Sequence, residues 1–405
     1  MRRARFISLL VLWLVCCCGK IPGLFASLVP AAQVTEQPGW DRVFERRSGW
    51  TGGDVAASII IPGERVLWLF GDSWVGEVKD NRHVNAVLVN NSIAIQTFDP
   101  GQPGKAPSPD RMNFYRGPDD AGKPTAWLRP VRDPRKPQTW YWPTGGAVVI
   151  PDEGGNPRLA LFLLELKKAG GDNVWGFECI GSRMALVDNV SAPVQFWKPV
   201  VIDLPHRIEG GDLSGNQIDW GVAAHYRAGA GGAPDYVFIY GVATDRGNNR
   251  ELLLARVFPS ALPEFKQWEF FAGAGKWEKS PPAAHSIVRG VAGELSVDRI
   301  AGRSGEFYYA MVYSEPFLGD RIFARIASAP EGPWSDLSPV FTVAEARRSP
   351  TLFAYAAKGH AGLSKPRTLL VSYIVNSNEF NELVNDASVY RPRFISVPLD
   401  MIGVR

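Results

Sequence analysis

The feature that most constrains the fold is a set of five β-rich units, each opening with a polar residue just ahead of small or branched residues. The openings are Asp54-Val-Ala-Ala, Thr144-Gly-Gly-Ala-Val, Asp219-Trp-Gly-Val-Ala-Ala, Glu294-Leu-Ser-Val and Lys358-Gly-His. Apolar runs that end at polar turns predict a second and a third strand in each unit. The predicted second strands are Val66–Gly71, Leu159–Leu164, Tyr236–Gly241, Phe307–Tyr313 and Thr368–Val375. The predicted third strands are Ser92–Ile95, Arg183–Val187, Leu252–Val257, Ile322–Ala327 and Arg393–Val397.

This repetition favours a single all-β domain, a five-bladed β-propeller. A closed ring of sheets brings the first strand of every unit to one axis, where residues distant in sequence converge. A two-sheet sandwich is the alternative, because alternating strands alone do not fix closure. Residues 49–405 are expected to form the propeller, residues 33–48 a connecting segment, and residues 99–138, rich in Pro, Gly and Asp, a long loop.

Residues 1–32 are predicted to be a signal peptide or a lipoprotein leader. Three arginines precede an apolar stretch from Phe6 to Val15 that is too short for a spanning helix. The run Cys16-Cys17-Cys18 resembles a lipobox, and cleavage near Ala31 or Ala32 is the alternative. We therefore expect a secreted, periplasmic or cell-surface bacterial protein whose contact with a membrane is limited to an N-terminal lipid anchor.

The positions of the cysteines and the net charge restrict the class of protein further. Only Cys179 lies outside the leader, so no intrachain disulfide is expected in the mature chain. Loss of the leader takes the formal charge from +3 to −1. No basic run is present, which argues against nucleic acid as a partner. We expect a monomer that binds a polysaccharide or oligosaccharide.

Three carboxylates are the predicted catalytic residues. Asp54, Asp219 and Glu294 open their units at matching places, so closure of the ring would gather them at one end of the axis. An Asp at the start of a strand can instead serve only as a turn former. Asp298 is an alternative to Glu294, four residues along the same segment.

Further polar and aromatic residues are candidates for substrate binding. Aromatic rings stack on sugars but also cover core edges, and a lone histidine is more often structural. The candidates are Asp72, Trp74, Trp142, Trp220, Asp298, His360, Asn376, Tyr390, Arg391 and Arg393. Motifs for a nucleophile elbow, a phosphate loop or a zinc site are absent from the sequence. No cofactor or metal is expected: an axial calcium ion would suit the fold, but no acidic loop of recognised spacing supports one.

Several motifs resemble a bacterial family long described only as a domain of unknown function, some of whose members are endo-D-arabinanases. They are Gly52-Gly53-Asp54, Phe70-Gly71-Asp72-Ser73-Trp74, Tyr141-Trp142-Pro143, Asp219-Trp220-Gly221, Lys358-Gly359-His360, Ser372-Tyr373-Ile374-Val375-Asn376 and Tyr390-Arg391-Pro392-Arg393-Phe394. The resemblance implies a five-bladed propeller similar to those of arabinanases and xylosidases. It also implies Asp54 as base, Asp219 as the orienting carboxylate and Glu294 as acid. Ala361 stands where the family pattern has Pro, which puts the substrate rather than the fold in question.

The sequence thus predicts a glycoside hydrolase that acts on an extracellular or cell-wall polysaccharide, with arabinan as the model. In this hypothesis like-charge repulsion from Asp219 keeps Glu294 protonated, and the reaction inverts the anomeric centre. A non-catalytic carbohydrate-binding propeller is the alternative, because fold does not fix function. A scaffold that docks other proteins would instead show a flat apolar patch.

Overall fold

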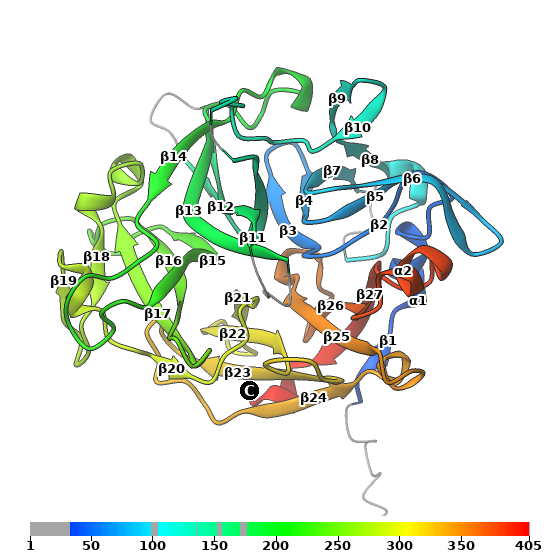
Figure 1. Ribbon diagram of the computed structural model, residues 1–405. Helices are drawn as coiled ribbons and strands as arrows, with labels where there is room; N and C mark the ends of the chain where they lie inside the picture. Colours follow the sequence, from blue (N-terminus) through cyan, green and yellow to red (C-terminus); the bar gives the residue numbers. More distant parts are fainter. Residues whose placement is uncertain (1–32, 99–103, 136, 152–155, 171–175, 405) are drawn as a thin grey trace, which may run out of the picture. The chain divides into compact units, whose positions relative to one another are not determined.

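The computed structural model describes residues 33–98, 104–135, 137–151, 156–170 and 176–404. The predicted leader, residues 1–32, lies outside these residues. The described chain is built almost entirely of antiparallel sheets arranged around a centre, which confirms the all-β prediction (Figure 1). No helix within the described ranges is long and apolar enough to cross a membrane.

Five larger sheets contain every predicted second and third strand, which confirms those predictions. Four of these sheets follow one another along the chain. The first contains β3 (Ala57–Ile61), β4 (Arg65–Phe70), β7 (Ser92–Thr97) and β8 (Met112–Tyr115). The second contains β11 (Thr139–Ile150), β12 (Arg158–Lys168), β13 (Phe177–Val187) and β14 (Val200–Leu204). The third contains β15 (Gln217–Arg227), β16 (Tyr236–Thr244), β17 (Arg250–Val257), β18 (Glu269–Phe271), β19 (Trp277–Glu278) and β20 (Val288–Arg289). The fourth contains β21 (Ser296–Ala301), β22 (Phe307–Ser314), β23 (Arg321–Ala327) and β24 (Ser338–Thr342).

The fifth sheet joins the two ends of the described chain. It contains β25 (Leu352–Gly359), β26 (Thr368–Ser377), β27 (Pro392–Pro398) and β1 (Thr35–Glu36). The short helix α1 (Pro38–Val43) follows β1, and its Asp41 carboxylate accepts a hydrogen bond from the Phe394 amide at 2.8 Å. Residues 33–48, predicted as a connecting segment, therefore complete the last sheet and cover its edge.

Additional strands lie where the sequence predicted a loop or no regular element. A three-stranded sheet of β2 (Ser48–Gly53), β5 (Ser73–Lys79) and β6 (Arg82–Val89) sits beside the first sheet. The predicted long loop at 99–138 supplies β8 and the hairpin of β9 (Gly117–Asp120) and β10 (Lys123–Thr125). Helix α2 (Phe380–Asn385) connects β26 to β27.

Bulges shape the strands that line the centre. β11, β15 and β25 each shift register, between Pro143 and Ala147, between Trp220 and Ala223, and between Tyr355 and Lys358. A bulge bends a strand and re-aims its side chains. Glycine permits the close approach of β11 to β15, because a Cβ on Gly146 would overlap the Gly221 carbonyl. Residues before each bulge therefore face one end of the ring, and those after it line the centre.

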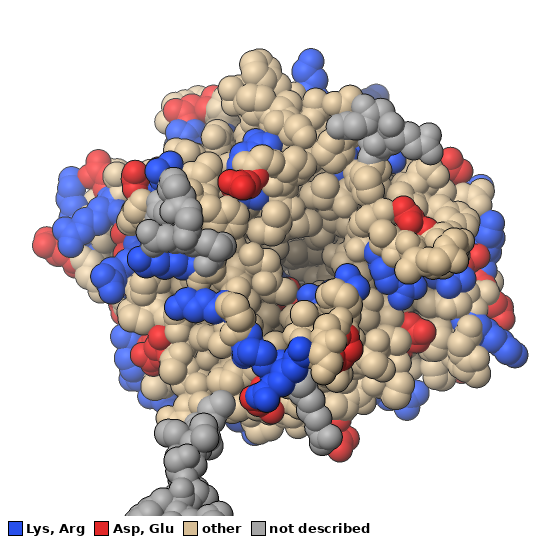
Figure 2. Space-filling view, turned by 180° about the vertical axis from the view of Figure 1, so that it is seen from behind, with Lys and Arg blue, Asp and Glu red and all other residues tan. Residues whose placement is uncertain are grey.

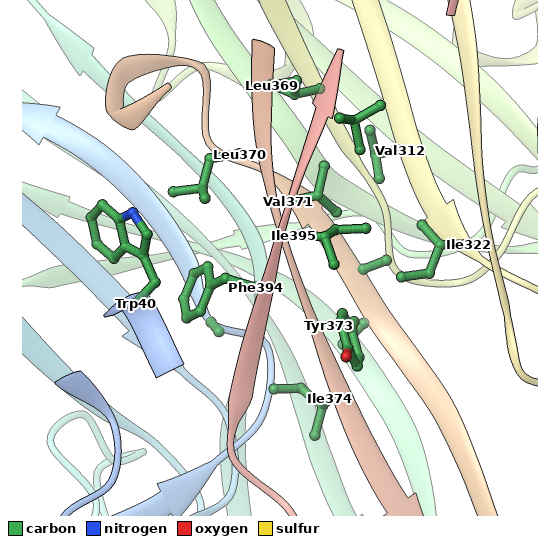
Figure 3. Packing of buried hydrophobic residues seen from close by; sticks show 14 of the residues in the cluster. Trp40, Val312, Ile322, Leu369, Leu370, Val371, Tyr373, Ile374, Phe394 and Ile395 are labelled. Atoms are coloured by element: carbon green, nitrogen blue, oxygen red, sulfur yellow. The ribbon is translucent and has the colours of Figure 1, made fainter. Parts of the chain in front are cut away.

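Buried apolar side chains fill the spaces between neighbouring sheets. The largest cluster joins α1, β22, β23, β26 and β27, with Trp40, Leu370 and Ile395 fully or almost fully buried (Figure 3). Burying a side chain of this size contributes about 1.5–3 kcal/mol. The fold therefore holds its central strands rigidly, which is what a precisely arranged site requires.

Candidate active site

Polar side chains gather where the central strands begin. Asp54 lies three residues before β3, and Glu294 lies two residues before β21. Asp72 follows β4, and since β4 is antiparallel to β3, its end lies beside the start of β3. Tyr355 lies in β25, at the register shift of that strand. Four segments distant in sequence thus meet at one end of the ring.

The Asp54 carboxyl group is at the centre of this cluster. Its Oδ2 atom accepts hydrogen bonds from the hydroxyls of Tyr355, at 2.6 Å, and Tyr390, at 2.7 Å. Its Oδ1 atom is buried and has no hydrogen-bond partner among the described residues. The pKa of Asp54 is raised to about 8, chiefly by burial and then by the charges of Asp72 and Glu294, while the tyrosine hydrogen bonds lower it. Asp54 is therefore largely protonated at neutral pH.

The backbone beside Asp54 is strained. Val55 has φ 64° and Ala56 has φ 45°, in the left-handed region that side chains with a Cβ rarely adopt. Each such residue costs on the order of 1–3 kcal/mol and persists only where its surroundings enforce it. Here the Asp54 amide donates to the Asp72 carbonyl at 3.2 Å, and a Cβ on Gly71 would overlap Oδ1 of Asp54. Packing thus fixes the position of this carboxyl group.

Asp72 is the neighbouring carboxyl group and has donors of its own. The indole Nε1 of Trp142 donates to its Oδ1 at 2.7 Å, and Nδ2 of Asn90 donates to the same atom at 3.4 Å. Burial raises the pKa of Asp72 to about 6, and these two hydrogen bonds lower it. Asp72 therefore ionises at a lower pH than Asp54.

Glu294 is paired with a buried lysine. The Nζ atom of Lys358 lies 3.4 Å from Oε2 of Glu294, and the lysine side chain is almost completely buried. Space for it comes from Gly145, where a Cβ would lie 2.8 Å from Cε of Lys358. Burial lowers the pKa of Lys358, whereas the charge of Glu294 raises it. Lys358 thus provides Glu294 with a buried cationic partner.

Asp219 lies in an adjoining polar group. Its Oδ1 accepts a hydrogen bond from Nε2 of Gln217 at 2.9 Å. Burial raises the pKa of Asp219 to about 6, against the hydrogen bond from Gln217 and the charge of Arg250. A Cβ on Gly293 would lie 3.5 Å from Nε of Arg250, so this arginine stands between Asp219 and the segment that carries Glu294.

Three of the predicted binding residues, Asp72, Trp142 and Tyr390, lie in the carboxyl cluster. The other two predicted tryptophans, Trp74 and Trp220, are core residues. Trp220 packs edge-on against Trp268 at 5.9 Å between ring centroids. Trp74 is buried and stacks on His83 at 4.8 Å. Neither indole presents a face for a sugar to stack on.

Asp298 and His360 lie apart from the carboxyl cluster. Asp298 accepts hydrogen bonds from Ser296 and from a backbone amide, and it lines the cavity at the centre of the ring. His360 is buried, with Nδ1 2.7 Å from Ser58 Oγ and Nε2 2.8 Å from Ser372 Oγ. Burial lowers the pKa of His360 to about 3, so its ring is neutral. Because Ser58 belongs to β3, the histidine connects the fifth sheet to the first.

The other predicted residues of the fifth sheet have partners outside the cluster. Arg391 pairs with Glu45 at 2.9 Å, and Arg393 lies 3.5 Å from Glu345. Asn376 accepts a hydrogen bond from the following backbone amide at 2.7 Å. We therefore leave these residues and His360 out of the proposed site.

Sequence analysis did not assign roles to Tyr355, Asn90 or Lys358. Tyr355 and Lys358 flank the bulge in β25, and a bulge removes the alternation by which facing residues are recognised. Asn90 lies in a turn without any motif. The Lys358 motif was an available signal, because a lysine within a buried segment needs a partner.

The centre of the ring holds a cavity of about 400 Å³. It is lined by residues of β3, β11, β15, β21 and β25, and Figure 2 shows a hollow at the centre of one face. Within the part of the chain that the structure describes, no group of three or more His, Cys, Asp or Glu residues is placed to hold a metal ion.

These observations define an all-β protein whose sheets surround a cluster of carboxyl groups. The chain matches the model of the family Domain of unknown function (DUF5005) over residues 38–398 and belongs to that family. Sequence comparison with curated proteins gives no match.

Solved structures show a shared fold. A protein from Bacteroides ovatus ATCC 8483 has 17% identity and a TM-score of 0.67, with 91% of this chain and 92% of that chain covered. The α-L-arabinofuranosidase of Podospora anserina, solved with cellotriose, has 9% identity and a TM-score of 0.40, with 87% and 92% covered. The exo-β-1,3-galactanase of Phanerochaete chrysosporium has 11% identity and a TM-score of 0.40, with 86% and 61% covered. The likeness to the Bacteroides protein concerns the fold and not the activity.

Proposed function

We propose that the protein is a glycoside hydrolase and that its five larger sheets are the blades of a five-bladed β-propeller. The observation that supports this function is the meeting of Asp54, Asp72 and Glu294 at one end of the central strands. Hydrolysis of a glycosidic bond needs one carboxylic acid that carries a proton and one ionised carboxylate. Burial and neighbouring charge hold Asp54 protonated, and the buried Lys358 pairs with the Glu294 carboxylate.

The proposed roles follow from these charges. Asp54 donates its proton to the leaving oxygen, and Glu294 acts as the base that activates water. Asp72, oriented by the Trp142 indole, supplies the negative charge that helps to keep Asp54 protonated. The sequence predicted the reverse, with Asp54 as the base and Glu294 as the acid. In this proposal Asp72 also takes the role of the third carboxylate, which was predicted for Asp219.

The substrate proposed is an extracellular or cell-wall polysaccharide, with arabinan as the first choice. The choice rests on the resemblance of the sequence motifs to those of endo-D-arabinanases. We further propose a secreted or lipid-anchored location, a monomeric state and inversion at the anomeric carbon. Following the anomer released first by NMR tests inversion: retention would refute it.

Leaving-group dependence tests the roles. With polysaccharide, Asp54→Asn should lower kcat by a hundredfold or more, because the leaving oxygen then departs unprotonated. With a 2,4-dinitrophenyl glycoside, whose leaving group needs no proton, the loss should shrink to less than about tenfold. Glu294→Gln should lower turnover of both substrates. Added azide should restore turnover of the 2,4-dinitrophenyl glycoside by this variant. The opposite pattern would reinstate the sequence-based roles.

A further inference from the structure

A second groove opens on the same end of the ring as the carboxyl cluster. It has a volume of about 540 Å³ and lies between the loop that joins β22 to β23 and the start of β25. Leu318, Leu352 and Phe353 supply apolar walls, and Ser349 and Asn378 add polar groups. Sites for small molecules have volumes of roughly 300–1,000 Å³ and combine apolar walls with a few polar groups in this way.

The groove lies next to residues that contact the proposed catalytic cluster on two sides. On one side the ring of Phe353 lies 5.7 Å from that of Tyr355, whose hydroxyl donates to Asp54. On the other side Phe317, the residue before Leu318, lies 5.5 Å from the guanidinium carbon of Arg250. Arg250 is the residue that stands beside the segment carrying Glu294. The groove is thus a near neighbour of the reacting centre, one layer of side chains away from it.

The walls of the groove are tied together before any ligand binds. The Ala354 amide donates to the Gly319 carbonyl at 2.7 Å, which fixes the loop to β25. Arg347 and Asp320 form an ion pair across the floor. Rigid walls reduce the entropy cost of binding, which favours a preformed site for a flexible chain.

Phe317 is the feature of this rim that the fold alone does not explain. Its side chain is 63% exposed, and its φ of 77° lies in the left-handed region. A bulky residue in that conformation is strained, and such strain clusters at ligand-binding sites. An exposed aromatic ring beside polar groups is the surface on which the apolar face of a sugar stacks.

We propose that this groove, with Phe317 at its rim, is a distal subsite that binds sugar residues beyond the bond being cleaved. The proposal rests on the proposed function and gives it a substrate class: chains of several sugar residues, in preference to disaccharides or aryl glycosides. The occupant is carbohydrate rather than protein, because the groove has the size of a small-molecule site and its polar groups lie within it.

The experiment measures binding separately from hydrolysis. Linear arabino- and xylo-oligosaccharides of three and six residues are titrated by calorimetry into Asp54→Asn protein, with and without Phe317→Ala. Removal of the ring should weaken binding of the hexasaccharide about 5-fold, equivalent to about 1 kcal/mol of stacking, and leave the trisaccharide unchanged. Phe307→Ala is the matched control, because Phe307 is an exposed ring beside Arg299 at the other end of β22.

The outcomes separate the two proposals. A loss confined to the hexasaccharide and to Phe317→Ala supports the subsite. Equal affinity of both Phe317 forms for the hexasaccharide, or an equal loss with Phe307→Ala, overturns the subsite and leaves the proposed function standing. No binding of any oligosaccharide, together with no hydrolysis of any polysaccharide by the unmodified protein, overturns both.

Discussion

Replacing Asp54 by Asn should inactivate the protein and also stabilise it at alkaline pH. The pKa of this carboxyl group is about 8 in the folded protein against an ordinary value of 3.8. Between these values the folded chain binds one more proton than the unfolded chain, so the free energy of unfolding falls as pH rises. One pKa unit corresponds to about 1.4 kcal/mol, which sets an upper bound of about 6 kcal/mol by pH 8.

The amide avoids this cost, since it has no charge to bury and its carbonyl can still accept the hydrogen bonds of Tyr355 and Tyr390. Local relaxation makes the actual effect smaller than this upper bound. We expect the free energy of unfolding of Asp54→Asn to exceed that of the unmodified protein by about 2–4 kcal/mol at pH 8.5. For a chain of this length that is a rise in Tm of about 3–6 °C. At pH 5 the folded forms of both proteins are uncharged at this position, but unfolded Asp54 is already ionised, so the Tm difference should be present and smaller than at pH 8.5.

Calorimetric unfolding from pH 5 to 9 measures the effect. The Tm difference between Asp54→Asn and the unmodified protein should widen steadily as pH rises, while Asp336→Asn, at an exposed position, should show no such trend. A constant difference across the range, or a variant less stable at pH 8.5 than the unmodified protein, would refute the view that Asp54 is protonated in the fold.

Three further substitutions test neighbouring contacts. Trp142→Phe removes a donor that lowers the pKa of Asp72, so the pKa of Asp72 followed by NMR titration should rise; an unchanged pKa would contradict this. Lys358→Met removes the cation beside the proposed base, and kcat/KM should fall at least tenfold, whereas full activity would exclude the pair from the mechanism. His360→Leu leaves two serine hydroxyls unpaired and should cost about 2–3 kcal/mol by urea unfolding, while His285→Ala, at an exposed position, should be neutral; equal costs would show that the hydrogen bonds carry no special weight.

The strands were predictable because their apolar runs are long and end at polar turns. Leu159–Leu164 lies within β12, and Thr368–Val375 lies within β26. Strands without such runs were missed. β2 has the sequence Ser-Gly-Trp-Thr-Gly-Gly, and its position is set by pairing with β5 rather than by its own composition.

The site was predictable in part. Asp54 and Asp72 stand beside glycines at strand ends, a local pattern that sequence shows directly. Tyr355 was missed, because the bulge that aims it toward Asp54 depends on pairing with β26. The charge state of Asp54 could not be predicted from the sequence, because it depends on burial and on Tyr355 and Tyr390, which lie more than 300 residues from Asp54.

The most direct test of the central claim is the release of sugars from polysaccharides. Unmodified protein, Asp54→Asn and Asp336→Asn are incubated with arabinans, xylans and galactans, and the products are separated by chromatography. We predict oligosaccharide release by the unmodified protein and by Asp336→Asn, and a hundredfold or greater loss with Asp54→Asn. Equal release by all three proteins would contradict the assignment of the carboxyl cluster, and binding without release by any of them would identify a carbohydrate-binding protein instead.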